Sequence, residues 1–214
     1  MNYYDEYRGK LRTPEEAVKV VKSGDWVDLS PNITFPVLLE AALAKRQDEL
    51  FDVKIRSNLI FHRLKTVESD PERKHFIYNS WHCSNYERQL CDRGLCNFIP
   101  MIFRNLGPYY RHFLTVNVAM ASVTPMDCHG YFNLSVGTGV TRTILEKADI
   151  VILEVNERLP HMLGGFDEMR TMPRPRLRKS LPRRKRLSLR MALLRLPALR
   201  SSRRPWTQRP QPSS

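Results

Sequence analysis

The turn around His129 holds the side chains that we first expect to contact a substrate. Asp127-Cys128-His129-Gly130 joins two predicted strands, and an imidazole there could hold a substrate carboxylate, because a histidine ring can donate hydrogen bonds. The alternative is that His129 and Gly130 complete a tight turn in which the ring caps a backbone group. Asp127 is then the side chain of an Asx turn rather than a catalytic base.

Polar residues in two other loops are further candidates. Asn32 lies in the loop Ser30–Thr34 and could present its amide to a ligand or form an Asx turn ahead of a helix. Glu154 belongs to a strand that is otherwise apolar, so it needs a partner, and we expect an ion pair or a place at the strand end rather than catalysis. Asn156 follows that strand. The predicted substrate-binding residues are His129, Gly130, Asn32 and Asn156.

The cysteines and glycines do not form a recognisable cofactor motif. The four cysteines lack the close pairs that zinc sites use, so the pattern favours free thiols and no metal. Gly137-Thr138-Gly139 lacks the further glycine and the lysine of a phosphate-binding loop. We therefore expect no bound cofactor. The cysteines and their neighbouring histidines are Cys83, Cys91, Cys96, Cys128, His82 and His129.

Strand and helix patterns alternate along the chain and must position these loops. The helices are expected from Thr13-Pro14-Glu15-Glu16 to Gly24, over Pro36–Glu49, over Asn85–Arg93 and over Val140–Lys147. The strands are expected at Trp26–Leu29, Phe51–Arg56, Phe76–Tyr78, Phe98–Phe103, Leu114–Met120, Tyr131–Val136 and Ile150–Val155. Pro100 counts against a central place for its strand.

This alternation predicts an α/β fold with a mainly parallel sheet and helices on both faces. Ligands of such sheets meet the loops at the carboxyl ends of the strands. The loops to examine are therefore Ser30–Thr34, Thr124–Gly130 and Asn156–Gly165.

Several segments resemble the acetyl-CoA hydrolase/transferase family. Thr124-Pro125-Met126-Asp127-Cys128-His129-Gly130-Tyr131-Phe132 is similar to the family's "SPxDxHGY" segment. The segments Asn97–Phe103 and Ile152–Pro160 resemble its "DYIPxFF" and "xxEVNxxMP" segments, and Gly24–Val27 with Pro36–Ala41 resembles its opening strand, loop and helix. The resemblance covers about residues 8–168, and the subgroup that transfers coenzyme A between butyryl- or 4-hydroxybutyryl-CoA and acetate is the most similar.

The resemblance implies a protein of two similar α/β halves. In that family a glutamate attacks the acyl-CoA thioester to form a glutamyl-CoA thioester, which a second carboxylic acid resolves. The glutamate and a Gly-rich loop belong to the second half, whereas this sequence has no Gly after Gly165 and no Glu after Glu168. The implied substrates are an acyl-CoA and a carboxylate, and a homodimer is an open alternative. We expect an N-terminal domain without catalytic residues, a truncated CoA-transferase that is inactive alone.

Charge divides the chain into two parts. Residues 1–169 carry 20 Lys and Arg against 22 Asp and Glu, a balance of −2, whereas residues 170–214 carry 15 Lys and Arg and no acid. The second part also holds 7 of the 15 prolines, which predicts a disordered basic tail. Its stretch 183–196 could form a short amphipathic helix. The alternatives for the tail are out-of-frame translation, a solvated tail without a role, or an arm that binds nucleic acid or a membrane.

Composition excludes several classes. The 214 residues contain no apolar run long enough to span a membrane and no export signal at the N-terminus, which together with unpaired cysteines predicts a cytoplasmic protein. Nucleic acid is the less favoured partner, yet a non-enzymatic binding module with a basic arm remains the alternative function. A hydrolase completed in trans by a separate second half is another.

Overall fold

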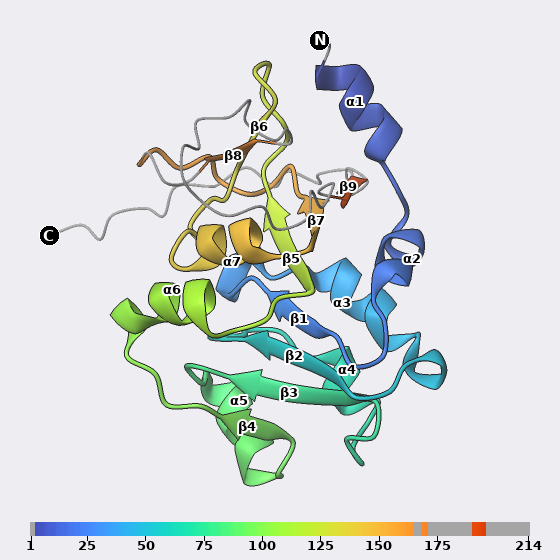
Figure 1. Ribbon diagram of the computed structural model, residues 1–214, viewed down its shortest axis with the longest axis vertical. Coiled ribbons are helices and arrows are strands. Elements are labelled where there is room, and N and C mark those ends of the chain that lie inside the picture. Colours follow the sequence, from blue (N-terminus) through green and yellow to red (C-terminus); the bar gives the residue numbers. More distant parts are fainter. Residues whose placement is uncertain (1–2, 165–167, 171–189, 196–214) are drawn as a thin grey trace, which may run out of the picture.

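The computed structural model describes residues 3–164, 168–170 and 190–195, with only the backbone considered in the last two segments. Its centre is a seven-stranded parallel sheet in the order β4-β3-β2-β1-β5-β7-β9 (Figure 1). The strands are β1 (Trp26–Leu29), β2 (Val53–Ser57), β3 (Phe76–Ser80), β4 (Cys96–Phe98), β5 (Val118–Val123), β7 (Ile150–Val155) and β9 (Arg190–Arg195). A separate antiparallel pair consists of β6 (Tyr131–Asn133) and β8 (Glu168–Arg170).

The strand order reverses direction between β1 and β5. From β1 the chain adds β2, β3 and β4 on one side and then returns to place β5 and β7 on the other. Asp28 of β1 therefore pairs with Arg56 of β2 on one flank and with Ala119 of β5 on the other. A reversal of this kind opens a crevice at the carboxyl ends of the two strands, which is where open α/β sheets bind ligands.

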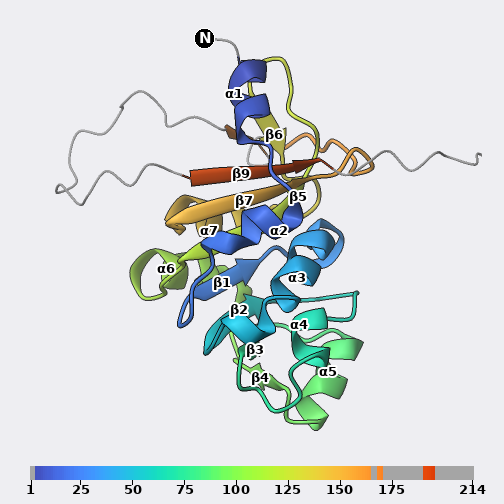
Figure 2. The same ribbon diagram turned by 90° about the vertical axis from the view of Figure 1, so that its right-hand side faces the viewer.

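Helices cover both faces of the sheet, as the sequence predicts (Figure 2). The helices are α1 (Tyr3–Lys10), α2 (Pro14–Ala17), α3 (Val37–Ala44), α4 (Lys65–Glu68), α5 (Asn85–Asp92), α6 (Phe103–His112) and α7 (Thr141–Lys147), and the short 3-10 turns are η1 (Val18–Val20), η2 (Asn32–Thr34) and η3 (Gln47–Glu49). One buried cluster joins α2 to α5 with β1, β2 and β3, and the other joins α6 and α7 with β5 and β7.

Alternation along the strands divides side chains between these two clusters. Val27 and Leu29 of β1 lie in the first cluster, whereas Asp28 between them points to the face that α6 covers. In β7, Ile152 belongs to the first cluster and Leu153 to the second. Because both faces are covered, the strands are buried almost throughout, which explains their nearly continuous apolar sequence.

Several expected boundaries are confirmed with their local causes. Thr13 caps α2 through a capping box with Glu16, although the helix becomes 3-10 after Ala17. The strand over Trp26–Leu29 and the strand over Ile150–Val155 have the expected bounds. The helix expected from Pro36 to Glu49 is interrupted, because α3 ends at Ala44 and only a 3-10 turn follows.

The structure differs most from the predicted secondary structure in the region after β4. Phe98–Phe103 is not a strand: β4 ends at Phe98, and α6 begins at Phe103. The sequence pattern did not predict α6, because Pro108 lies inside it and proline normally breaks a helix. The following strand also lies later than expected, at Val118–Val123 instead of Leu114–Met120.

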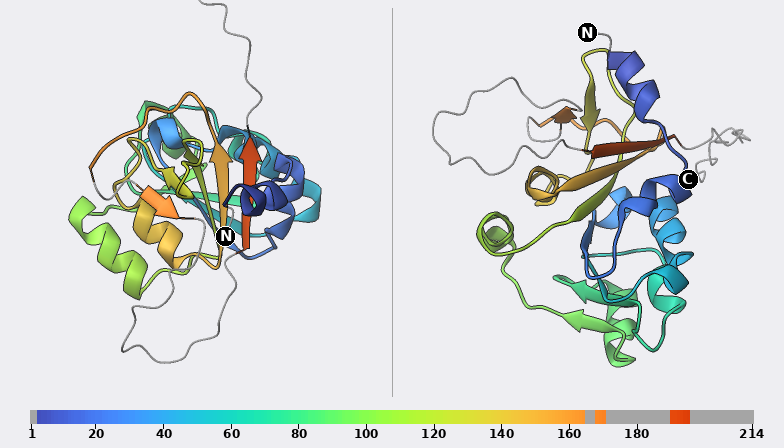
Figure 3. Two further views of the ribbon diagram at one scale, coloured as in Figure 1. Left: turned by 90° about the horizontal axis from the view of Figure 1, so that it is seen from above. Right: turned by 45° about the vertical axis from the view of Figure 1, so that its right-hand side comes forward.

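Two short segments of the predicted basic tail lie within the described residues, and both are strands. Arg170 ends β8, and residues 190–195 form β9 rather than part of an amphipathic helix. An edge strand offers unpaired backbone groups, and β9 pairs in parallel with the edge of β7 from Ile150–Arg190 to Val155–Arg195 (Figure 3). The other residues of the predicted tail lie outside the described residues. Within the described part, no helix is both long and apolar enough to cross a membrane.

Candidate functional site

Two of the predicted substrate-binding residues lie where β1 and β7 end at the carboxyl edge of the sheet. Asn32 begins η2 with a φ of 45°, and its Oδ1 accepts a hydrogen bond from the Ile33 N–H at 2.9 Å. Asn156 directly follows β7, and its Oδ1 accepts from the Arg158 N–H at 2.9 Å. Both side chains are half-buried and bond within their own loops. Their positions border the crevice beside β5, and their bonds shape its loops.

His129 and Gly130 lie elsewhere, at the tip of the hairpin between β5 and β6 (Figure 1). His129 is exposed, whereas Gly130 is buried against α1 with a φ of 81°. A Cβ atom at Gly130 would come 2.7 Å from the Tyr3 ring, so glycine is required by both space and φ. The Asp127 Oδ1 accepts from the His129 and Tyr131 N–H groups at 2.8 Å, which confirms the Asx turn.

Glu154 is buried near the end of β7 and has hydrogen-bond partners for both of its carboxylate oxygens. Its Oε2 accepts hydrogen bonds from the Leu38 and Leu39 N–H groups at the start of α3, at 3.0 and 3.1 Å, and its Oε1 accepts from the Ser122 hydroxyl at 3.4 Å. Burial raises the pKa of Glu154, and these hydrogen bonds oppose that rise. The expected place at the strand end is confirmed, with backbone N–H groups as its partners.

The loop after β6 packs tightly over this end of the sheet. A Cβ atom at Gly137 would lie 2.1 Å from the Thr34 Oγ1, so a larger residue cannot occupy that position without moving η2. Asn133 holds the segment after β7, because its Oδ1 accepts from the Met162 N–H and its amide donates to the Met162 carbonyl at 2.7 Å. The Ser135 hydroxyl donates to the Pro160 carbonyl at 2.8 Å. These contacts join the loops after β1, β6 and β7 into one edge.

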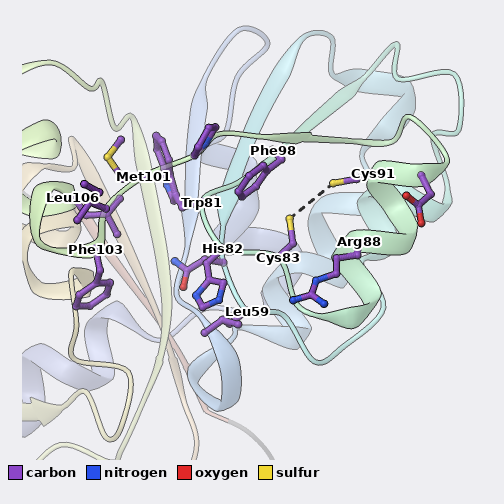
Figure 4. A pocket seen from close by; sticks show the side chains of 14 residues that line it. Leu59, Trp81, His82, Cys83, Arg88, Cys91, Phe98, Met101, Phe103 and Leu106 are labelled. Carbon is purple, nitrogen blue, oxygen red and sulfur yellow. Dashed lines mark hydrogen bonds between the residues drawn. The ribbon is translucent and has the colours of Figure 1, made fainter.

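A cleft of about 1040 Å³ opens beside this edge, at the carboxyl ends of β2, β3 and β4 (Figure 4). Most of its wall is apolar, and His82, Arg88 and Asp92 are its titratable side chains besides two cysteines. The apolar wall consists of Leu59, Trp81, Phe98, Pro100, Met101, Ile102, Phe103 and Leu106. A concave, mainly apolar wall with a few polar groups is typical of small-molecule sites.

A buried polar chain holds Trp81 in that wall. Arg56 donates two hydrogen bonds to Asp28, at 3.0 and 2.6 Å, and both side chains are buried. The Tyr110 hydroxyl donates to Asp28 at 2.5 Å, and the Trp81 indole donates to the Tyr110 oxygen at 3.1 Å. This chain links β1, β2 and α6 to the residue after β3, so the cleft rests on a fixed support.

Sequence reasoning missed the cleft. Its residues come from the ends of β3 and β4 and from α6, a helix that the sequence pattern did not predict. One available signal is the apolar run from Phe98 to Phe103, which follows a short strand and remains exposed at Phe98, Ile102 and Phe103. Large apolar side chains that remain exposed together indicate a contact surface.

Three of the four cysteines converge beside the cleft, and two of them, Cys83 and Cys91, line it. The Sγ atoms of Cys83, Cys91 and Cys96 all lie within 4.8 Å of one another, and those of Cys83 and Cys91 are 3.8 Å apart (Figure 4). Burial raises the pKa of the Cys83 and Cys96 thiols. Cys128 is exposed in the turn before β6 and does not belong to this cluster. The linear spacing gives no close pair, but the fold brings these three side chains together.

The fold is an α/β domain of the doubly wound type with a cleft at the carboxyl edge of its sheet, the edge where open α/β sheets bind ligands. The chain belongs to the acetyl-CoA hydrolase/transferase family, whose N-terminal domain matches residues 1–176. The family that the sequence motifs resemble is thereby confirmed.

Curated relatives agree with this assignment. The chain is 44% identical over 169 residues to a butyryl-CoA:acetate CoA-transferase of Anaerostipes caccae, covering 78% of this chain and 38% of that protein. It is 43% identical over 165 residues to a probable butyrate:acetyl-CoA coenzyme A-transferase of Syntrophomonas wolfei, covering 77% of this chain and 37% of that protein. The chain thus spans less than two fifths of the length of these relatives.

Solved structures show the same fold. RipA from Yersinia pestis superposes with a TM-score of 0.75 at 24% identity, covering 100% of this chain and 47% of that chain. A 4-hydroxybutyrate CoA-transferase from Porphyromonas gingivalis superposes with a TM-score of 0.64 at 17% identity, covering 91% of this chain and 41% of that chain.

Proposed function

We propose that this chain forms the N-terminal half of a CoA-transferase that moves coenzyme A between a short-chain acyl-CoA, such as butyryl-CoA, and acetate. The observation that carries the proposal is the 44% identity over 169 residues to a butyryl-CoA:acetate CoA-transferase. We also propose that the protein is located in a reducing compartment such as the cytoplasm. All four cysteines are free, which supports that placement.

The cleft is the proposed binding site for the acyl-CoA. Its volume of about 1040 Å³ leaves room for a short acyl chain and part of the coenzyme. The acyl chain would lie against Trp81, Met101 and Phe103, because an apolar chain gains most from an apolar wall. Arg88 supplies a cation to the same cleft and would pair with a phosphate of the coenzyme.

The chemistry implied by the family requires a glutamate, and no glutamate is among the residues that line the proposed binding site, whose carboxylate is Asp92. The family resemblance implies a glutamate that attacks the thioester carbon and releases the coenzyme thiolate, which leaves an acyl-glutamyl anhydride. The thiolate then attacks the glutamyl carbonyl of this anhydride, so that the acyl group leaves as a carboxylate and a glutamyl-CoA thioester remains. Near the crevice, Glu154 is buried and bonded to α3, so it is poorly placed for such an attack. We therefore propose that this polypeptide binds acyl-CoA but does not complete the transfer alone.

Calorimetric titration of the full chain with butyryl-CoA tests the binding site. Arg88→Ala is expected to weaken binding about tenfold, equivalent to about 1.4 kcal/mol, because one phosphate partner is lost. Arg93→Ala is the matched control, since Arg93 follows the same helix but pairs with Glu68 outside the cleft. Absence of butyryl-CoA binding, or equal weakening by both variants, would overturn the assignment of the cleft.

Turnover is measured separately, as acetyl-CoA formed from butyryl-CoA and acetate by the same preparation. We expect no product from the chain alone. Acetyl-CoA formation at a rate that depends on this chain would contradict the proposal that a second half is needed, whatever the result of the binding experiment.

A further inference from the structure

The three converging cysteines form a cluster that the proposed transfer of coenzyme A does not use. Cys83 follows β3 and precedes the N-cap of α5, Cys91 lies in the last turn of α5, and Cys96 begins β4. Cys83 and Cys96 are 13 positions apart in the sequence, yet their side chains lie together. The way in which α5 begins and ends explains this proximity.

The start of α5 is fixed by Glu87. Its carboxylate accepts hydrogen bonds from the Ser84 N–H at 2.8 Å, from the Tyr78 hydroxyl at 2.6 Å and from the Ser80 hydroxyl at 2.7 Å. Glu87 is fully buried, so these bonds tie the first turn of α5 to β3. Cys83 therefore has a defined position beside the helix.

The end of α5 turns the chain back toward Cys91. The Gly94 N–H donates to the Cys91 carbonyl at 2.9 Å and the Leu95 N–H donates to the Leu90 carbonyl at 2.8 Å, the two bonds of a Schellman motif. Gly94 takes the positive φ of 71° that the motif requires. Cys96 then enters β4 next to the last turn of the helix.

We propose that Cys83, Cys91 and Cys96 bind one Zn²⁺ ion as three thiolates, with the fourth coordination position open toward the cleft. Thiolates are the ligands that Zn²⁺ prefers among protein side chains. Tetrahedral Zn–S bonds of 2.3 Å place neighbouring sulfurs about 3.8 Å apart, and the Cys83 and Cys91 sulfurs already have this separation. The other separations, at most 4.8 Å, require a small closure of side chains.

The positions of the three thiols and a nearby cation are compatible with this ion, which would displace the thiol protons into solvent when it binds. Cys96 is 7% exposed and closes the site on the side of the core, whereas Cys83 and Cys91 line the cleft. A zinc ion with three thiolates carries a net charge of −1, and Arg88 on α5 supplies a cation to the same cleft that Cys83 and Cys91 line (Figure 4). A site with three protein ligands and one open position is the arrangement in which zinc keeps an exchangeable ligand.

The competing interpretation is that the thiols serve only as small apolar side chains. Cysteine packs in this way when it binds no metal, and Cys83 and Cys91 do pack against the larger buried cluster. The two interpretations differ in stoichiometry and in the effect of single substitutions, so both can be measured without any enzymatic assay.

The test uses the full chain, purified with a reductant and a chelator and then freed of the chelator. Titration with Zn²⁺ against a chromophoric chelator is expected to show one site per chain, and Co²⁺ is expected to give thiolate charge-transfer absorption with tetrahedral ligand-field bands. Cys83→Ser and Cys91→Ser, at half-buried positions, should each weaken binding by more than about 100-fold, because loss of an outer-shell partner alone costs 10- to 100-fold.

Cys128→Ser is the matched control, since Cys128 is the one cysteine outside the cluster. This variant should bind Zn²⁺ as the unaltered chain does, and circular dichroism of each variant verifies that it is folded. No stoichiometric site, no cobalt–thiolate absorption, or equal affinity in folded Cys83→Ser and the unaltered chain would overturn the proposal in favour of packing alone.

Discussion

At Asp28 a buried carboxylate and a buried guanidinium meet between two neighbouring strands. The pair is bidentate, and Tyr110 and Trp81 extend it to the wall of the cleft. Arg56 also stacks over Trp26, with 4.4 Å from its guanidinium carbon to the ring centroid. Removing one partner of such a pair leaves a buried charge without compensation, which costs more than the pair itself contributes.

Asp28→Asn is therefore expected to lower the free energy of unfolding by about 3–5 kcal/mol. Urea denaturation of the full chain, followed by circular dichroism, measures this change. Glu15→Gln is the control, because it breaks an ion pair with Lys45 at the exposed surface, and it should leave the midpoint nearly unchanged. A loss at Asp28 no larger than the loss at Glu15 would show that the buried pair does not support the fold.

Glu154 should make stability depend on pH. Its folded-state pKa lies above the ordinary value of 4.5, chiefly because of burial, so the native state holds the proton more tightly than the unfolded state. The contribution of Glu154 is then greatest below its unfolded pKa and falls as the pH rises through its raised folded pKa.

Unfolding in urea at several pH values from 4 upward measures the difference in stability between the unaltered chain and Glu154→Gln. That difference should shift in favour of Glu154→Gln as the pH rises. Glu146→Gln, which removes an exposed carboxylate from α7, controls for the loss of one charge. A difference in stability that stays constant with pH, or that shifts in favour of the unaltered chain as the pH rises, would contradict a raised pKa of Glu154 in the folded state.

At the scale of elements, the loops at the carboxyl edge depend on one close approach. Gly137 lies against Thr34 of η2 so closely that a Cβ atom would overlap the threonine side chain. Thr34 ends the 3-10 turn that follows β1, and Gly137 lies in the loop that follows β6. The close packing of these two segments thus depends on the absence of a side chain at Gly137.

Gly137→Ala is expected to destabilise the chain by about 1–3 kcal/mol, as overpacking typically does. Gly164→Ala is the control, because a Cβ atom there meets no other atom within 4 Å. Thermal unfolding of both variants measures the effect. If the two midpoints coincide, the approach of the two loops is looser than the structure indicates.

For the whole molecule, exposed apolar side chains gather at the carboxyl edge and beside the cleft. Phe98 ends β4 and Phe103 begins α6, and the others lie in the segments that follow strands: Ile33, Phe61, Ile102 and Val136. An exposed apolar surface of this kind favours contact with another protein surface. We expect the isolated chain to self-associate through it.

Phe103→Ser should therefore reduce self-association of the full chain, measured by sedimentation velocity over a range of concentrations. Phe51→Ser is the matched control, since Phe51 is 65% exposed at the amino end of β2 and Phe103 is 69% exposed beside the cleft. A monodisperse chain at all concentrations, or an equal effect of both substitutions, would show that this edge is not the associating surface.

The sequence by itself determined the fold class, the family and the local turns. Capping residues at Thr13 and the apolar run Ile150–Val155 act within one segment, so their patterns predicted structure directly. The Asx turn of Asp127 is local in the same sense.

Only the tertiary structure decided the site. The cleft joins the ends of β2, β3 and β4 to α6, and the cysteine cluster joins positions on both sides of a helix. Glu154 finds its partners more than 100 positions away, at the start of α3. These contacts depend on the strand order and on how the helices pack across the sheet. The spacing of residues along the chain predicts neither of these features.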